Sequence, residues 1–135
     1  MNIDKPGLFH GTNKESLEDI IKDGYVKSVS WWAKDIKHAA EEGLNGIKNR
    51  VSQKSNFIRS VKVLNELITN LRILKIKLNS VSYNNLEIQG TTDKELQDYP
   101  ERDYLKLYII VPYKDLEVIN ITNEIREYLF DKNGV

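Results

Sequence analysis

The segment Leu8-Phe9-His10-Gly11-Thr12 combines residue types that suit the binding of a flat ligand at the end of a strand. Glycine has no side chain, so a flat group can approach its backbone and bond to the N–H and C=O groups. A neutral imidazole beside it can reach a ribose hydroxyl. The alternative is a histidine that is satisfied at a strand end and followed by a turn glycine. Both interpretations remain open at this point.

Two adjacent tryptophans, Trp31 and Trp32, follow Ser30 in a segment rich in β-branched and aromatic residues. Neighbours on a strand point to opposite faces, so only one of the two can line a cleft directly. An aromatic face can stack on a flat, electron-poor ring. Ser30 would supply a hydrogen-bonding group nearby. The pattern does not decide which tryptophan faces a cleft and which fills the core.

A third candidate is the acidic run 99–103, Tyr-Pro-Glu-Arg-Asp, which lies directly ahead of an apolar strand candidate. By itself such a run is typical of a solvated turn of mixed charge. Other catalytic classes lack their signatures, because the sequence contains no cysteine, GxGxxG, Walker loop or nucleophile elbow. His38 has no partner at metal-ligand spacing, so no metal site is expected.

Capping residues and hydrophobic spacing predict the elements that must position these side chains. A strand over 8–12 leads into a helix that Asn13 caps and Gly24 ends. A single strand is then expected over 25–32. The first two candidate segments therefore lie on strands that are separated by one helix.

The middle of the chain is expected to contain a second helix, a loop, a third helix and a strand. Lys34-Asp35 opens the second helix, and the polar residues 45–56 predict a loop. Apolar residues at helical spacing over 57–71 predict the longest helix. The alternation of polar and apolar residues over 72–78 predicts a strand with one wet face.

The last third of the chain is mostly strand by pattern. Apolar residues within 79–100 favour a strand or a pair of strands before a turn and a short helix, and 104–111 is the most apolar strand candidate. Residues 112–115 turn the chain, 116–121 return as a strand, and Thr122 caps a final helix. Runs of strands after helices, without regular alternation, predict an α+β fold with antiparallel pairing.

Length and composition limit the classes of function. The 135 residues are expected to form a single domain over 1–135, and 20 basic with 20 acidic side chains leave a formal net charge of zero. No global field therefore favours nucleic acid or an anionic membrane. Basic residues between 48 and 77 are interpreted as solvated faces rather than a nucleic-acid surface. No leader or membrane span is recognised, so a soluble cytoplasmic protein is expected.

Taken together, the segments resemble the ADP-ribosyltransferase fold family, in the branch of poly-ADP-ribose polymerases and diphtheria-type toxins. Leu8-Phe9-His10-Gly11-Thr12 matches the opening strand, Gly24 the end of the first helix, and 30–35, followed by Ala39, the paired-aromatic strand and the alanine-bearing helix. The resemblance covers residues 7–44. Beyond them it rests on the order of elements and the acidic run. It implies a split antiparallel β-sandwich of two small sheets with flanking helices.

The resemblance also implies roles for individual residues. NAD would be the co-substrate, with His10 on the adenosine-side ribose, the Gly11 backbone on the nicotinamide amide and Thr12 bracing the loop. Trp31 or Trp32 would stack on nicotinamide, with Ser30 close by. Glu101 would be catalytic, because a carboxylate beside the anomeric carbon stabilises an oxocarbenium-like transition state. Asp103 is the alternative carboxylate, in a shifted register.

Two departures from the family pattern bear on the function. The stretch 38–43 lacks the tyrosine that usually completes a clamp on nicotinamide. Tyr99 stands where arginine-modifying toxins have Gln or Glu, two residues before Glu101, and this disfavours arginine as the acceptor. The acceptor is therefore expected to be recognised by loops such as 45–56 or 84–100.

The sequence thus favours a mono-ADP-ribosyltransferase that acts on a macromolecular acceptor, most simply a host protein, as a small toxin or phage effector. One alternative is a catalytically inactive relative that binds and inhibits a partner. Another is a nucleic-acid-modifying relative, which the neutral net charge does not favour. None of these functions is expected to require a metal ion or a membrane.

Overall fold

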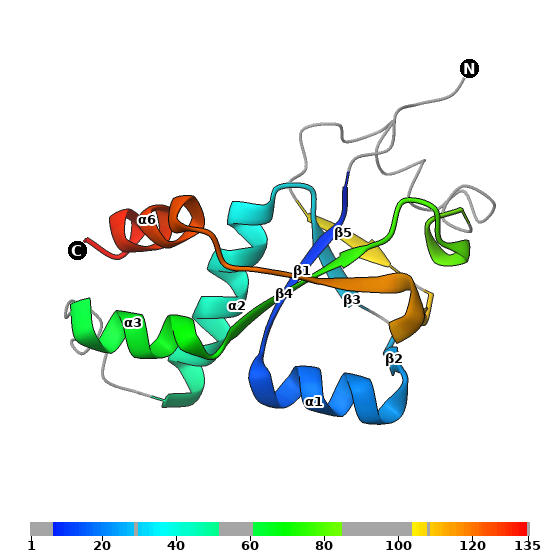
Figure 1. Cartoon of the computed structure of the whole chain (residues 1–135), viewed down its shortest axis with the longest axis horizontal. Helices are drawn as coiled ribbons and strands as arrows, with labels where there is room; N and C mark the ends of the chain where they lie inside the picture. The colour runs from blue at the N-terminus through cyan, green and yellow to red at the C-terminus, as the bar shows by residue number, and fades with distance from the viewer. Residues whose placement is uncertain (1–6, 29, 52–60, 85–103, 108, 135) are drawn as a thin grey trace, which may run out of the picture.

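Antiparallel strand pairing organises the protein, and helices cover the sheet (Figure 1). The computed structural model describes residues 7–28, 30–51, 61–84, 104–107 and 109–134. Its strands are β1 (Phe9–Asn13), β2 (Tyr25–Val26), β3 (Ser30–Ala33), β4 (Leu71–Ile76), β5 (Tyr104–Leu107), β6 (Val111–Pro112) and β7 (Leu116–Ile119). Its helices are α1 (Lys14–Asp23), α2 (Ile36–Val51), α3 (Val61–Thr69) and α6 (Asn123–Lys132), with a short 3₁₀ turn η2 (Tyr113–Asp115). The fold class is α+β, as the sequence predicts.

The main sheet has five strands in the order β5-β3-β1-β4-β7, and every pair in it is antiparallel. The central strand β1 pairs with β4 along its whole length, from Phe9 opposite Lys75 to Asn13 opposite Leu71. Its pairing with β3, in contrast, is confined to Phe9 opposite Ala33. Beyond that pair, β1 and β3 separate within the sheet.

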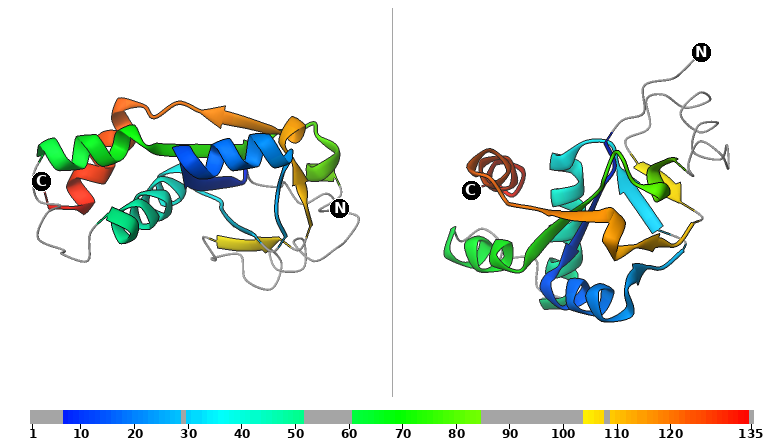
Figure 2. Two further views of the ribbon diagram at one scale, coloured as in Figure 1. Left: turned by 90° about the horizontal axis from the view of Figure 1, so that it is seen from below. Right: turned by 45° about the vertical axis from the view of Figure 1, so that its right-hand side comes forward.

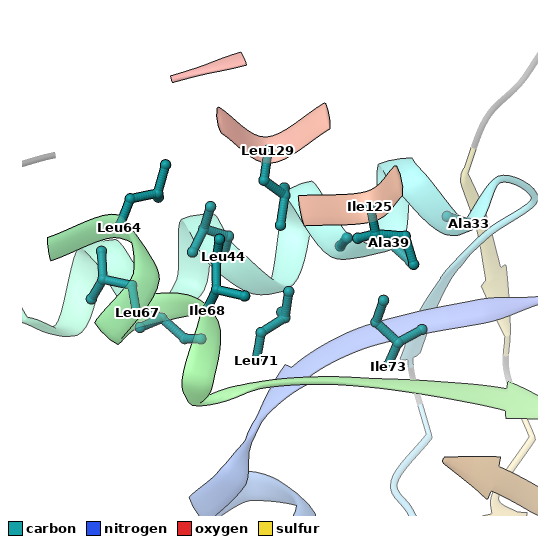
Figure 3. Packing of buried hydrophobic residues seen from close by; sticks show 12 residues of the cluster. Ala33, Ala39, Leu44, Leu64, Leu67, Ile68, Leu71, Ile73, Ile125 and Leu129 are labelled. Carbon is teal, nitrogen blue, oxygen red and sulfur yellow. The ribbon is translucent and has the colours of Figure 1, made fainter. Parts of the chain in front are cut away.

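Helices α2, α3 and α6 cover one face of the main sheet and bury its largest apolar cluster (Figure 3). Leu44 of α2, Leu64 and Ile68 of α3, and Leu129 of α6 are 2% exposed or less. Ile73 of β4 faces them from the sheet. These helices gather at one end of the molecule, away from β2 and β6 (Figure 2).

The opposite face of the main sheet is covered by α1 and by the two-stranded sheet of β2 and β6. Leu17 of α1 and Val26 of β2 join Trp32 and Leu74 in a second buried cluster. Two sheets thus pack on either side of an apolar layer, and helices flank the larger one. The family resemblance implies two small sheets, whereas the observed strands divide unequally, five and two.

Two strands expected from the sequence are each divided between the two sheets. The predicted strand 25–32 is β2 in the small sheet and β3 in the main sheet. Likewise, 104–111 is β5 in the main sheet and β6 in the small one. Each apolar run leaves one sheet and enters the other, which hydrophobic alternation alone does not reveal.

Two further predictions from the middle of the chain are wrong. The polar residues 45–51 belong to α2, because Ile47 still packs on the core at 4% exposure. The described part of α3 ends at Thr69, and Leu71 already begins β4. The first part of the predicted helix, residues 57–60, lies outside the described residues.

Strand β4 does not have the wet face that its alternation predicts. Adjacent Ile73 and Leu74 point to opposite faces and both are fully buried, since each face of the sheet is covered at this strand. Residues 81–84 form a helical turn where a strand is expected. The remainder of the predicted 79–100 segment, from residue 85, lies outside the described residues, as do 52–60.

The helix caps, by contrast, are confirmed. The Asn13 side chain accepts a hydrogen bond from the Ser16 N–H at 2.9 Å, and Gly24 ends α1 with a left-handed φ of 87°. Thr122 caps α6 by accepting from the Ile125 N–H at 3.3 Å. These caps are local, so the sequence specifies them directly.

Candidate functional site

A cavity of about 830 Å³ lies where β1 and β3 separate. Its walls come from five consecutive elements, β1, α1, β2, β3 and α2, and the lining residues lie between Phe9 and Glu42. Of the residues singled out in the sequence, the lining includes five: His10, Gly11, Thr12, Ser30 and Trp31. The tertiary structure therefore brings two of the three candidate segments to one cavity.

Gly11 presents its backbone to the gap between β1 and β3. The Ile76 N–H donates to the Leu8 carbonyl across β1 and β4, so the alternate residues Leu8, His10 and Thr12 direct their backbone groups toward β4. The N–H and C=O of Gly11 consequently point the other way, toward β3. Since β3 pairs only with Phe9, these groups lie on an open edge of the strand.

The glycine also has a packing role, which the sequence interpretation did not include. A Cβ atom at Gly11 would overlap the Ala39 carbonyl oxygen and lie 2.8 Å from the Gly43 nitrogen, both in the α2 backbone. Helix α2 therefore crosses β1 at a position that admits no side chain. The same residue meets the helix on one face and offers hydrogen-bonding groups at its strand edge.

His10 is fixed in one tautomer by its contact with β3. Its Nδ1 lies 2.8 Å from the Trp31 carbonyl oxygen, which only accepts, so Nδ1 carries the proton. Burial lowers the pKa of His10 below its ordinary value of 6.5, and the bond to the Trp31 carbonyl partly opposes this shift. The neutral ring keeps Nε2 as an acceptor. This nitrogen can accept a hydrogen bond from a hydroxyl group of a ligand.

The two tryptophans occupy opposite environments, as strand alternation requires. Trp31 is 55% exposed and lines the cavity, and the Lys106 ammonium lies 5.6 Å from its ring centroid. Trp32 is fully buried, and its indole N–H donates to the Ser30 hydroxyl at 2.7 Å. Trp31 is accordingly available to a ligand, whereas Trp32 is a core residue outside the cavity lining that supports His10 by a tilted ring contact at 5.2 Å.

Charged lining residues were missed by the sequence interpretation. Asp19 and Asp23 of α1, Glu42 of α2 and Lys27 after β2 all line the cavity. Asp19 and Asp23 are four residues apart, so a helical reading of 14–23 places them on one face. No local pattern in the sequence indicates that this face shares a cavity with Glu42, because β2 and β3 lie between the two helices in the chain.

The acidic run that contains Glu101 and Asp103 lies outside the described residues. The strand after it, β5, is described by its pairing with β3, with Leu105 opposite Trp32 and Tyr104 opposite Ala33. Asp103 is one residue and Glu101 three residues before the start of β5, and the partner strand of β5 carries Trp31.

Thr12, the last residue of the first candidate segment, lines the cavity and is 9% exposed.

No family model, curated protein or solved structure matches this chain. Within the described ranges, no group of three or more His, Asp or Glu side chains is arranged to hold a metal ion. Among the same residues, no helix has the length and apolar character needed to span a bilayer. The geometry of the cavity is therefore the guide to the function of this chain.

Proposed function

We propose that this protein is an ADP-ribosyltransferase-like enzyme that cleaves NAD and transfers ADP-ribose to a macromolecular acceptor, most simply a protein in the cytoplasm. One observation carries the proposal. The first two candidate segments lie on β1 and β3, and the third directly precedes β5. These three strands are neighbours in the order β5-β3-β1, although Thr12 and Arg102 are 90 positions apart in the sequence. The cavity lies between two of these strands.

The groups that face the cavity suit the parts of NAD. The open edge of Gly11 offers one donor and one acceptor, which complement the amide of nicotinamide. The acceptor Nε2 of His10 suits a ribose hydroxyl. The exposed ring of Trp31 can stack on a flat base, and Lys27 can meet the pyrophosphate. The cavity volume of about 830 Å³ is in the range of small-molecule sites.

The proposed reaction breaks the bond between the nicotinamide nitrogen and the anomeric carbon of its ribose. Nicotinamide leaves with the bonding electron pair, and a nucleophilic atom of the acceptor bonds to the anomeric carbon and releases its proton. Positive charge develops on the ribose as the first bond breaks. A carboxylate at that position lowers the barrier, and Glu101 is the proposed carboxylate.

The experiment incubates purified protein with NAD labelled in the adenylate part, together with a bacterial lysate. Label on protein, label on nucleic acid and released nicotinamide are measured separately. Glu101→Gln is expected to bind NAD with an affinity close to that of the starting protein, because the shape of the side chain is kept. It should lose turnover by about a hundredfold or more, because the charge is removed.

Asp103→Asn is the matched control, since it removes a carboxylate two residues away in the same run. Retained turnover in this variant supports Glu101, and the reverse pattern would assign Asp103. NAD binding without label or nicotinamide release would favour the inactive, partner-binding alternative. Turnover that requires added RNA or DNA would favour the nucleic-acid-modifying alternative.

A further inference from the structure

Glu42 lines the cavity, and the proposed function assigns no role to its side chain. It precedes Gly43 on α2, and a Cβ atom on Gly43 would lie 3.0 Å from the Gly11 carbonyl carbon. Glu42 itself lines the cavity together with Gly11 and Ala39. Glu42 therefore lies in the part of the cavity wall formed by α2, the helix whose backbone packs on Gly11.

The charge of the nicotinamide ring depends on its redox state. In NAD⁺ the ring is a pyridinium with a formal positive charge, whereas in NADH the dihydropyridine ring is neutral. The two forms otherwise have the same ribose, pyrophosphate and adenine groups. A carboxylate near the ring consequently attracts the oxidised form more strongly than the reduced form.

We infer that Glu42 is a specificity-determining residue that favours NAD⁺ over NADH at this cavity. The inference rests on the proposed function, which positions the nicotinamide amide at Gly11. Glu42 then contributes a negative charge to the α2 wall of the cavity that holds the ring.

The other charged groups of the described lining do not duplicate this effect. Asp19 and Asp23 lie on α1, across the cavity from α2. Lys27 is the cationic side chain of the described lining and follows β2. His10 is neutral, since burial lowers its pKa. Among the described lining carboxylates, Glu42 is the one on the same helix as the Ala39 and Gly43 backbone that packs on Gly11.

The test measures the dissociation constants of NAD⁺ and NADH by calorimetric titration of the full chain. All proteins carry Glu101→Gln, so that NAD⁺ is not consumed. The protein with Glu42 intact is expected to bind NAD⁺ more tightly than NADH. Glu42→Gln should reduce this preference by about threefold, the size expected of an exposed charge pair. Raised salt should reduce the preference in the protein with Glu42 and leave it unchanged in the variant.

Glu41→Gln is the matched control, because Glu41 is adjacent on α2 but bonds to the Tyr128 hydroxyl at 2.9 Å instead of lining the cavity. This variant should keep the full preference for NAD⁺. Equal affinities for the two forms, or an unchanged preference in Glu42→Gln, would overturn the inference while leaving the proposed function intact. Failure of both forms to bind would overturn the proposed function, and the inference with it.

Discussion

Gly11 of β1 and Gly43 of α2 lie backbone against backbone. A Cβ atom built on Gly43 would stand 3.0 Å from the Gly11 carbonyl carbon and 3.0 Å from the Thr12 nitrogen. This crossing sets the position of α2 on the sheet, and with it the position of Glu42 in the cavity wall. Gly11 is therefore required by packing, whether or not its strand edge also binds a ligand.

Gly11→Ala should destabilise the protein by about 3 kcal/mol, because the new methyl group meets helix backbone rather than a movable side chain. Gly46→Ala is the control on the same helix, where a Cβ meets nothing within 4 Å. It should stabilise the protein by about 0.8 kcal/mol through helix propensity. Urea unfolding of the three proteins measures both effects. A Gly11→Ala protein as stable as the starting protein would contradict the crossing.

Ser30→Ala should cost about 1 to 3 kcal/mol of unfolding free energy, because it leaves the buried indole N–H of Trp32 without its 2.7 Å acceptor. Ser28→Ala is the matched control at an exposed position and should change stability by less than about 0.5 kcal/mol. Thermal or urea unfolding compares the two. Equal effects of both substitutions would show that the Trp32 bond contributes nothing to stability.

The two tryptophans should report separately by fluorescence. In Trp32→Phe the remaining Trp31, 55% exposed, should emit at long wavelength and be quenched readily by acrylamide. In Trp31→Phe the remaining Trp32, fully buried, should emit at shorter wavelength and be protected. Circular dichroism checks that each variant is folded. Similar quenching of both residues in folded protein would refute the assigned orientation of β3.

Stability should depend on His10 below about pH 6.5. Burial lowers the pKa of His10 in the folded state from 6.5, so the unfolded chain binds the proton first as the pH falls. The folded state therefore loses stability as the pH drops from about 6.5 toward the lowered pKa, by at most about 1.4 kcal/mol per pH unit for one proton. Above that window, His10 contributes no pH dependence.

The measurement compares unfolding free energies of the starting protein and His10→Asn between pH 8 and the acid limit of folding. The cavity carboxylates Asp19, Asp23 and Glu42 are present in both, so the difference between the two curves isolates His10. The variant should lack the slope that begins near pH 6.5. Parallel curves would show that His10 does not titrate differently on folding. Any NAD affinity should weaken only as the pH falls through the lowered pKa of His10 in the folded protein, because a protonated Nε2 no longer accepts.

The sequence alone determined the features that depend on a few neighbouring residues. Asn13, Gly24 and Thr122 act within one helical turn, so their caps follow from residue type and spacing. The α+β class follows from the order of helical and strand patterns. Strand alternation likewise required Trp31 and Trp32 to point in opposite directions, although it did not say which one is exposed.

The tertiary structure decided where each element belongs and which groups meet. An apolar run reads alike in either sheet, so the division of 25–32 into β2 and β3 depended on long-range pairing. In the sequence, Glu42 has the pattern of an ordinary solvated charge. The packing of α2 on β1 brings it into the same cavity wall as Gly11. Long-range packing is not encoded in any local window of residues, because it is set by the burial of surfaces from the whole chain at once.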